Sequence, residues 1–182
     1  VLLCDSFLPA CLACDFTWYP NPEKFAKHGP RKDICKHCFQ PASTMFESLG
    51  VTVHRYSELV TLDEQQRAEY VSATIPSNEI PEFVLNGCAV GEHALAGTLR
   101  FYARCTLDEE PYADQILRRY FKAALLTTYA VRKLLKKIDF QTAVFHHGIY
   151  VPQGLIGEVA RQEKVRVVNW NPAYRKKCFI FS

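Results

Sequence analysis

Apolar side chains recur every three to four residues along several stretches of the chain, and this spacing predicts amphipathic helices. The longest such stretch covers residues 115–137. Acidic residues precede it, and Lys136 and Lys137 end it, which complements the helix dipole. Further helices are predicted over residues 41–49, 92–102 and 153–163, and between the capping box at 61–64 and Pro76.

Short runs of apolar or alternating residues predict strands at 1–5, 51–55, 142–145, 165–168 and 178–181. Between residues 142 and 168 a strand, a short turn, a helix and a second strand follow one another, which is typical of a parallel crossover. Repetition of such units predicts an α/β fold: a Rossmann-like, doubly wound, mainly parallel sheet with helices on both faces, in three α/β/α layers. We expect residues 1–182 to form a single domain, with residues 7–40 as an irregular insertion rich in Cys and Pro.

The composition of the chain fits a folded domain. Its 182 residues are 48% hydrophobic and 23% charged, values near the globular average. The formal net charge of +3 is too small to indicate a nucleic-acid partner. No apolar run approaches the roughly 20 residues that cross a bilayer, and the run Val1–Leu3 is too short for a secretory signal. We therefore predict a cytoplasmic protein whose eight cysteines are reduced.

Two Cys-x2-Cys pairs form the most specific spacing in the chain. Cys11 and Cys14 make up the first pair, and Cys35 and Cys38 make up the second. A tetrahedral Zn²⁺ site needs four soft ligands, and each pair supplies two of them from one turn, so the spacing indicates a structural zinc site. Other side chains that suit this metal are those of Cys4, His28 and His37. The alternative is that the cysteines are ordinary reduced thiols, partly buried as small apolar side chains.

A turn at His146, His147 and Gly148 follows the strand predicted at 142–145. Ligands of open parallel sheets bind at the carboxyl ends of strands, and glycine permits a tight turn or the close approach of a ligand. Each histidine is therefore a candidate general base for a sugar hydroxyl, or a contact to the acceptor. The alternative is that one histidine packs beneath the loop while the other is solvated.

Four other features carry weaker predictions. Arg100 and Arg104 are spaced by one helical turn, and Arg104 is a candidate contact to a phosphate, with a plain surface position as the alternative. Asp5, at the end of the strand predicted at 1–5, and Tyr150, just beyond the turn at 146–148, are candidate substrate contacts. The basic face of the helix at 115–137 is interpreted as solvated, although such a face also suits an anionic membrane surface.

Three groups of residues resemble bacterial glycosyltransferases of capsule and surface-polysaccharide biosynthesis. Residues 34–38 and 45–51 resemble their first helix region, and residues 91–102 resemble their helix of small residues that ends in Arg-Tyr or Arg-Phe. The segment 145–170 resembles their most recognisable block, in which a strand ends in a polar residue and Gly, a helix carries an Ala-Arg pair, and another strand follows. On these motifs the chain resembles the N-terminal half of a two-domain (GT-B) enzyme.

This resemblance implies two Rossmann-like domains, of which the N-terminal one receives a glycan or lipid-linked acceptor. A C-terminal domain, expected after Ser182, would bind the nucleotide-sugar donor, and the chemistry would need no metal. The base would come from the N-terminal domain, although relatives often carry Asn where this chain has His146 and His147. Peripheral association with the inner membrane on its cytoplasmic face is compatible with this function.

Two other functions stay open. One is a zinc-stabilised binding module, built on the Cys cluster and without catalytic activity of its own. The other is a doubly wound enzyme of a different kind, such as a sugar-nucleotide epimerase. Against the epimerase, the chain has Asp5–Pro9 after its first predicted strand, where a dinucleotide-binding enzyme carries G-x-G-x-x-G.

Overall fold

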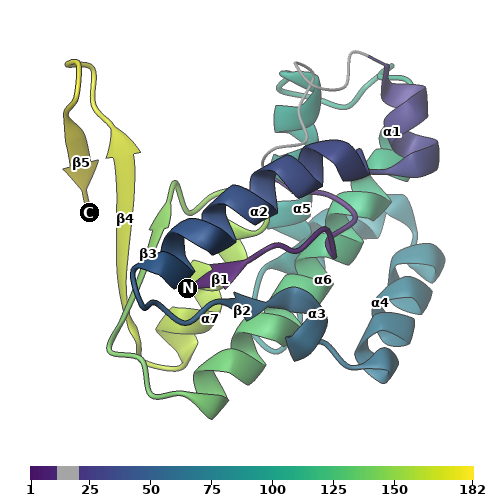
Figure 1. The fold of residues 1–182 in the computed structure, drawn as a ribbon. Coiled ribbons are helices and arrows are strands. Elements are labelled where there is room, and N and C mark those ends of the chain that lie inside the picture. Colours follow the sequence, from purple (N-terminus) through teal and green to yellow (C-terminus); the bar gives the residue numbers. More distant parts are fainter. Residues whose placement is uncertain (12–20) are drawn as a thin grey trace.

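A computed structural model describes residues 1–11 and 21–182 of the chain, and Figure 1 shows that helices make up most of it. The helices in chain order are α1 (Pro22–His28), α2 (Lys32–Ser48), α3 (Tyr56–Leu59), α4 (Leu62–Thr74), the 3-10 helix η1 (Ser77–Glu82), α5 (Val90–Tyr102), α6 (Ala113–Lys137) and α7 (Gln153–Gln162). The strands are β1 (Leu2–Leu3), β2 (His54–Arg55), β3 (Thr142–His146), β4 (Arg166–Pro172) and β5 (Phe179–Phe181).

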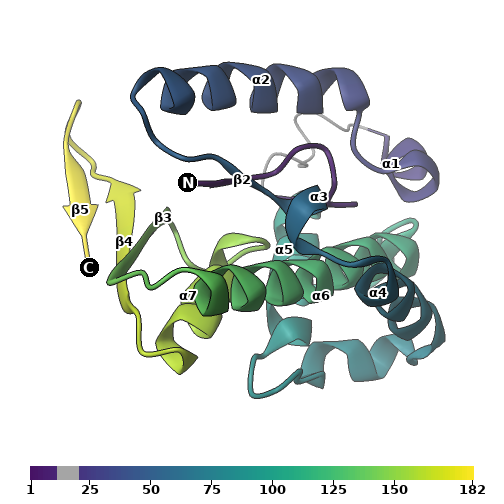
Figure 2. The same cartoon turned by 60° about the horizontal axis from the view of Figure 1, so that its bottom comes forward.

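The strands of the described residues form two separate small sheets. In one, β1 pairs with β2 in the parallel sense. In the other, β3 pairs with β4 in parallel, from Thr142 opposite Arg166 to His146 opposite Trp170, and β4 pairs with β5 in the antiparallel sense. Figure 2 shows α2 on one side of β1 and β2, with α6 and α7 on the other side.

Helix α6 forms the centre of the core. Its side chains Phe121, Leu125 and Leu126 are at most 2% exposed, and α4, α5 and α7 all pack against it. Phe25 of α1 joins the same core by stacking on Phe101 of α5, with ring centroids 4.8 Å apart. Full burial of one such side chain stabilises a fold by about 1.5–3 kcal/mol. A central helix with buried side chains along its length therefore contributes much of the stability of this chain.

The predicted Rossmann-like fold is wrong for this chain. The described residues form two small sheets, of which the three-stranded one is mixed, whereas the prediction requires one large and mainly parallel sheet with helices on both faces. The apolar runs at 1–5 and 51–55 yield only two paired residues each, and β5 is antiparallel to its neighbour. The core is built around α6, and no residue of these two runs belongs to its buried part, so burial does not require them to extend as strands. The parallel crossover β3–α7–β4 is the part of the prediction that is confirmed.

Residues 7–40, predicted to be irregular, contain α1 and the first part of α2. Asn21 caps α1, since its side-chain oxygen accepts a hydrogen bond from the amide of Lys24 at 3.2 Å. Pro22 follows in the first turn, where no backbone N–H is needed. Helix α2 continues through Pro41, so the helix predicted to begin at 41 begins instead at Lys32. Pro41 has no N–H to donate to the carbonyl of His37, one turn earlier in the helix. Both residues are exposed, so water can donate a hydrogen bond to that carbonyl instead.

Several helix boundaries agree with the sequence pattern. The capping box that opens α4 is confirmed, since the amide of Thr61 donates to Oε2 of Glu64 at 2.7 Å and the amide of Glu64 donates to Oγ1 of Thr61 at 3.3 Å. Helices α5, α6 and α7 begin and end within two residues of the predicted positions. None of the described helices is both long enough and apolar enough to span a bilayer.

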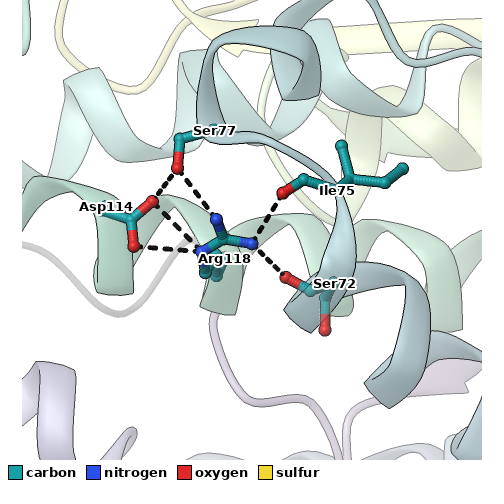
Figure 3. Close-up of polar contacts among 5 residues, drawn as sticks. All are labelled: Ser72, Ile75, Ser77, Asp114 and Arg118. Atoms are coloured by element: carbon teal, nitrogen blue, oxygen red, sulfur yellow. Dashed lines mark hydrogen bonds and ion pairs between the residues drawn. The ribbon is translucent and has the colours of Figure 1, made fainter.

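Basic side chains on α6 hold neighbouring elements to this helix. Figure 3 shows Arg118, whose Nη1 donates to the carbonyl oxygens of Ser72 at 2.8 Å and Ile75 at 2.9 Å. Its Nε donates to Asp114 at 3.0 Å, and its Nη2 donates to the hydroxyl of Ser77 at 2.9 Å. Arg119, Lys122 and Arg132 likewise contact Ala26, Glu69 and Gln162. The interpretation of this face as merely solvated is therefore wrong for these four residues.

Candidate functional site

A cavity of about 710 Å³ lies between β1 and β3. Residues 1–4 line it on one side and residues 142–146 on the other, so each strand borders it along its length. Val131 and Leu134 of α6 and Ile156 of α7 add apolar side chains to its wall. Small-molecule sites typically enclose about 300–1,000 Å³. The carboxyl end of β3 therefore meets a space large enough for a ligand.

The turn after β3 gathers four aromatic rings. His146 stacks on Trp170 of β4 with centroids 4.4 Å apart, and the ring of His147 lies 3.6 Å from that of His146 and 6.0 Å from that of Tyr150. The φ angles of His147 and Gly148 are 66° and 92°, a region that non-glycine residues adopt rarely and mostly at special sites. The structure thus brings together four of the predicted site residues, at positions 146, 147, 148 and 150.

Three polar atoms near this turn are buried and have no hydrogen-bond partner among the residues that the structure describes. They are Nε2 of His146, Oε1 of Gln153 and Oδ1 of Asn169. His146 and Gln153 line the cavity, whereas Asn169 lies against Gly148, where an added Cβ would come within 3.0 Å of its amide group. A buried polar atom without a partner costs roughly 1–3 kcal/mol. The unpartnered atoms are closed to solvent, so a ligand in the cavity reaches them only if these side chains move.

The protonation state of His146 suits a base. Burial lowers the pKa of His146, and the neighbouring His147 and the guanidinium of Arg100 lower it further. The imidazole is therefore mainly neutral at neutral pH, which is the form that accepts a proton. A neutral imidazole beside a site for hydroxyl groups is the arrangement that general-base chemistry requires.

Arg100, rather than Arg104, reaches the cavity. Arg100 lines the cavity wall, and its guanidinium carbon lies 5.3 Å from the centroid of the Tyr150 ring. Arg104 instead donates a hydrogen bond from Nε to Oε1 of Glu110 at 2.8 Å, and its side chain is 64% exposed. Arg104 lines only a second, more open cavity of about 570 Å³, to which Arg100 and Tyr150 also contribute. Spacing by one helical turn indicates this pair of arginines, but it does not show which of the two lines the cavity.

The remaining predicted substrate contact, Asp5, makes a structural contact. Its carboxylate accepts hydrogen bonds from both the hydroxyl and the amide of Ser57, the latter at 3.4 Å. These bonds tie the end of β1 to the start of α3. Asp5 is not among the described residues that line the cavity. Gln153 is a polar cavity residue for which the sequence held no signal, beyond its position at the start of the predicted helix at 153–163.

The predicted zinc ligands are only partly described, since Cys14 lies outside the described residues. Cys4, Cys11 and Cys38 line one cavity, although they come from three separate segments. Burial raises the pKa of Cys4 to about 12 and also raises the pKa of Cys35 and Cys38, so these thiols are protonated at neutral pH. Within residues 1–11 and 21–182, no group of three or more His, Cys, Asp and Glu side chains is arranged to hold a metal ion. The four-cysteine zinc site therefore stays a prediction.

Comparison of the chain with protein-family models, with curated proteins and with solved structures gave no match. The cavity and the side chains around it therefore carry the functional assignment.

Proposed function

We propose that the cavity between β1 and β3 binds the acceptor of a sugar-transfer reaction, and that the chain is the acceptor-binding part of a glycosyltransferase. The observation that carries this proposal is that two polar side chains, those of His146 and Gln153, line the same cavity. A sugar presents hydroxyl groups, which both donate and accept hydrogen bonds. The resemblance of residues 145–170 to glycosyltransferases of surface-polysaccharide assembly supports the same reaction class.

The proposed chemistry is a direct displacement. The oxygen of the acceptor hydroxyl attacks the anomeric carbon of a nucleotide sugar, and a new carbon–oxygen bond forms as the bond from that carbon to the diphosphate breaks. The hydroxyl proton passes to the neutral imidazole of His146, and the nucleoside diphosphate leaves with the electron pair. His147, Gly148 and Tyr150 shape the turn beside the reacting hydroxyl. Binding of the donor is proposed for a separate C-terminal domain, and the location is proposed to be cytoplasmic because the seven described cysteines are free thiols, as in a reducing compartment.

The test is sugar transfer by the protein made from its complete natural gene. Replacing His146 with Gln keeps a polar side chain but removes the base, and we expect the transfer rate to fall by about 10²–10⁴-fold. The combination with His147→Ala should fall at least as far. His37→Gln, at an exposed position of α2, is the matched control and should retain the parental rate. A parental rate in the His146→Gln enzyme contradicts the proposal.

A second candidate function is the zinc-stabilised binding module. The observation in its favour is that Cys4, Cys11 and Cys38 share one cavity wall. Metal analysis of the purified protein separates the two candidates. One zinc per chain, whose removal by a chelator unfolds the segment around residues 4–38, would support the module. Protein that is folded without bound metal would exclude it.

A further inference from the structure

Three aromatic side chains lie on one face of the sheet formed by β3, β4 and β5. Trp170 in β4 is opposite Phe181 in β5, and the ring of Phe179 meets that of Trp170 edge-on, with centroids 5.6 Å apart. Phe145 in β3 points to the other face, where an added Cβ at Gly157 of α7 would come within 2.8 Å of its ring. The register pairs Phe145 with the residue before Trp170, and side chains alternate between faces, so the three rings lie on the face away from α7.

Two of these rings are open to solvent. Phe179 is 55% exposed and Phe181 is 66% exposed, values that are high for large apolar side chains. Figures 1 and 2 show the β4–β5 hairpin (residues 166–182) at one end of the molecule, with β5 on the outer side of β4. A partner can therefore reach these rings from solvent.

The turn that joins β4 to β5 is strongly basic. It carries Arg175, Lys176 and Lys177, which are all exposed, and the guanidinium carbon of Arg175 lies 5.6 Å from the centroid of the exposed Tyr174 ring. Within the described part of the chain, none of these three cations forms an ion pair with an Asp or Glu side chain.

The positive charge of the hairpin is hidden in the totals for the whole chain. The formal net charge is only +3, because 19 acidic residues offset 22 basic ones. None of those acids lies between residues 164 and 182, where every charged residue is Lys or Arg. The hairpin therefore combines a local excess of positive charge with exposed aromatic rings.

We propose that the aromatic face and the basic turn of this hairpin bind a single-stranded nucleic acid, DNA or RNA, with little preference for its sequence. Unpaired bases stack on exposed aromatic rings, and exposed cations attract the phosphates that join them. Three of the four exposed large apolar side chains of the hairpin are aromatic, which favours planar bases over a lipid surface. An acidic peptide would satisfy the cations but would not use the rings. This inference goes beyond the proposed function and does not depend on it.

Fluorescence anisotropy of labelled oligonucleotides tests the inference on the protein made from its complete natural gene. The probes are oligo(dT) and oligo(U) of about 12 nucleotides and a DNA duplex of the same length. We expect at least one single strand to bind at least about fivefold more tightly than the duplex, since pairing closes the base faces to stacking. The tighter of the two single strands identifies DNA or RNA as the ligand. Equal or tighter binding of the duplex contradicts the role of the rings.

The salt dependence of binding tests the role of the basic turn. Three phosphate contacts predict that the logarithm of the association constant falls with the logarithm of the salt concentration with a slope of about −2. An increase from about 50 mM to about 150 mM salt should therefore weaken binding by about tenfold. The double variant Arg175→Gln/Lys176→Gln should reduce this slope to about −0.7. Lys133→Gln/Lys136→Gln, at exposed positions of α6, is the matched control and should keep the parental affinity and slope. Equal losses in the two double variants overturn the inference.

The aromatic rings should affect affinity but not the salt dependence. Phe179→Thr/Phe181→Thr keeps residues that suit a strand, and we expect it to weaken the single strand by about tenfold or more at an unchanged slope. Both positions are exposed, so the core around α6 stays intact. Tyr70→Thr, at a 70% exposed position of α4, should bind as the parent does. Parental affinity in the double Phe variant shows that the rings do not stack on bases.

Other anionic partners of the hairpin give a different result. Vesicles of phosphatidylglycerol and soluble poly-glutamate carry the charge without the bases, and co-sedimentation or anisotropy measures their binding. If either binds through Arg175 and Lys176 while neither oligonucleotide binds, the partner is a lipid surface or an acidic protein and the inference is wrong. Displacement of either one by oligo(dT) or oligo(U) supports it.

Discussion

The imidazole Nε2 of His93 in α5 lies 3.2 Å from Oε1 of Glu158 in α7, with no hydrogen bond between the two atoms. The other ring nitrogen, Nδ1, donates to the carbonyl oxygen of Ile149 in the turn that follows β3. Oε2 of Glu158 accepts a hydrogen bond from the amide of Ala89 at 2.6 Å. His93 is only 12% exposed. These partly buried contacts hold the turn that carries His147 and Tyr150 against α5 and tie the start of α5 to α7, so they position the candidate site from outside the cavity.

Replacing His93 with Leu should loosen this turn. The change removes the donor to Ile149 and leaves Glu158 facing an apolar side chain, at a cost of about 1–3 kcal/mol. We expect the amides of residues 147–151 to exchange hydrogen at least tenfold faster, as measured by hydrogen–deuterium exchange, while α4 keeps its protection. Glu158→Gln, which still offers an oxygen to the amide of Ala89, should have a smaller effect. Unchanged exchange at 147–151 in the Leu variant would show that the network does not hold the turn.

Replacing Gly91 with Ala should destabilise the whole fold. A Cβ at this position would lie 1.6 Å from the carbonyl oxygen of Ile80, so η1 must move away from α5. The amide of Gly91 also donates to the carbonyl of Phe83 at 2.9 Å, which keeps the two segments in close contact. We expect the free energy of unfolding in urea to fall by about 2–4 kcal/mol.

Gly50→Ala is the control for this steric effect. A Cβ at Gly50 would meet nothing within 4 Å, and the only penalty comes from its φ of 70°. That left-handed conformation costs about 1–2 kcal/mol for a residue with a Cβ. A loss for Gly91→Ala no larger than that for Gly50→Ala would show that η1 moves away at little cost.

Replacing Arg118 with Met should detach the end of α4 from α6. The guanidinium donates hydrogen bonds to the carbonyls of Ser72 and Ile75 and to the carboxylate of Asp114 (Figure 3). Met fills similar space but leaves these oxygens without that donor, and we expect the free energy of unfolding to fall by about 2–4 kcal/mol. Lys133→Met, at an exposed position of the same helix, should change it by less than about 0.5 kcal/mol. Equal effects of the two variants in urea titrations would contradict the role of Arg118.

Local elements were predictable from the sequence because their signals are local. The spacing of apolar residues and the capping box at Thr61 each act within one or two turns, and the helices that they predict are present. The strand–helix–strand unit from β3 to β4 was also predictable, because it is formed by one continuous segment of the chain. Gly97 lowers helix propensity, yet it lies inside α5 because an added Cβ there would come within 2.6 Å of the Tyr120 ring. Packing of α5 on α6 thus explains a residue that propensity alone disfavours.

The overall fold, and the question of which arginine lines the cavity, depend on contacts between residues that are distant in the sequence. The pattern of residues along the chain does not encode these contacts. Whether the runs at 1–5 and 51–55 lengthen into a sheet depends on what covers them, and here α2 and α6 do so on opposite sides. The turn at 146–150 was predictable because its residues are consecutive. Arg100 and Arg104 do not share a helical face, because α5 ends at Tyr102 and Ala103 is left-handed, so Arg104 lies outside the helix and pairs with Glu110. Spacing by one helical turn cannot show that the helix ends between the two arginines.

Alkaline pH should destabilise the chain through Cys4. Burial raises the pKa of the Cys4 thiol from 9.0 to about 12, so the folded state keeps it neutral while the unfolded chain ionises it. The stabilisation is therefore complete below about pH 9 and is lost progressively as the pH rises from 9 towards 12. We expect Cys4→Ala to flatten the fall in the free energy of unfolding between pH 8 and about pH 10.5, measured in urea. Cys105→Ala, at an exposed position, should keep the parental slope. If Cys4→Ala also keeps that slope, the thiol of Cys4 is ionised as readily in the folded chain as in the unfolded one.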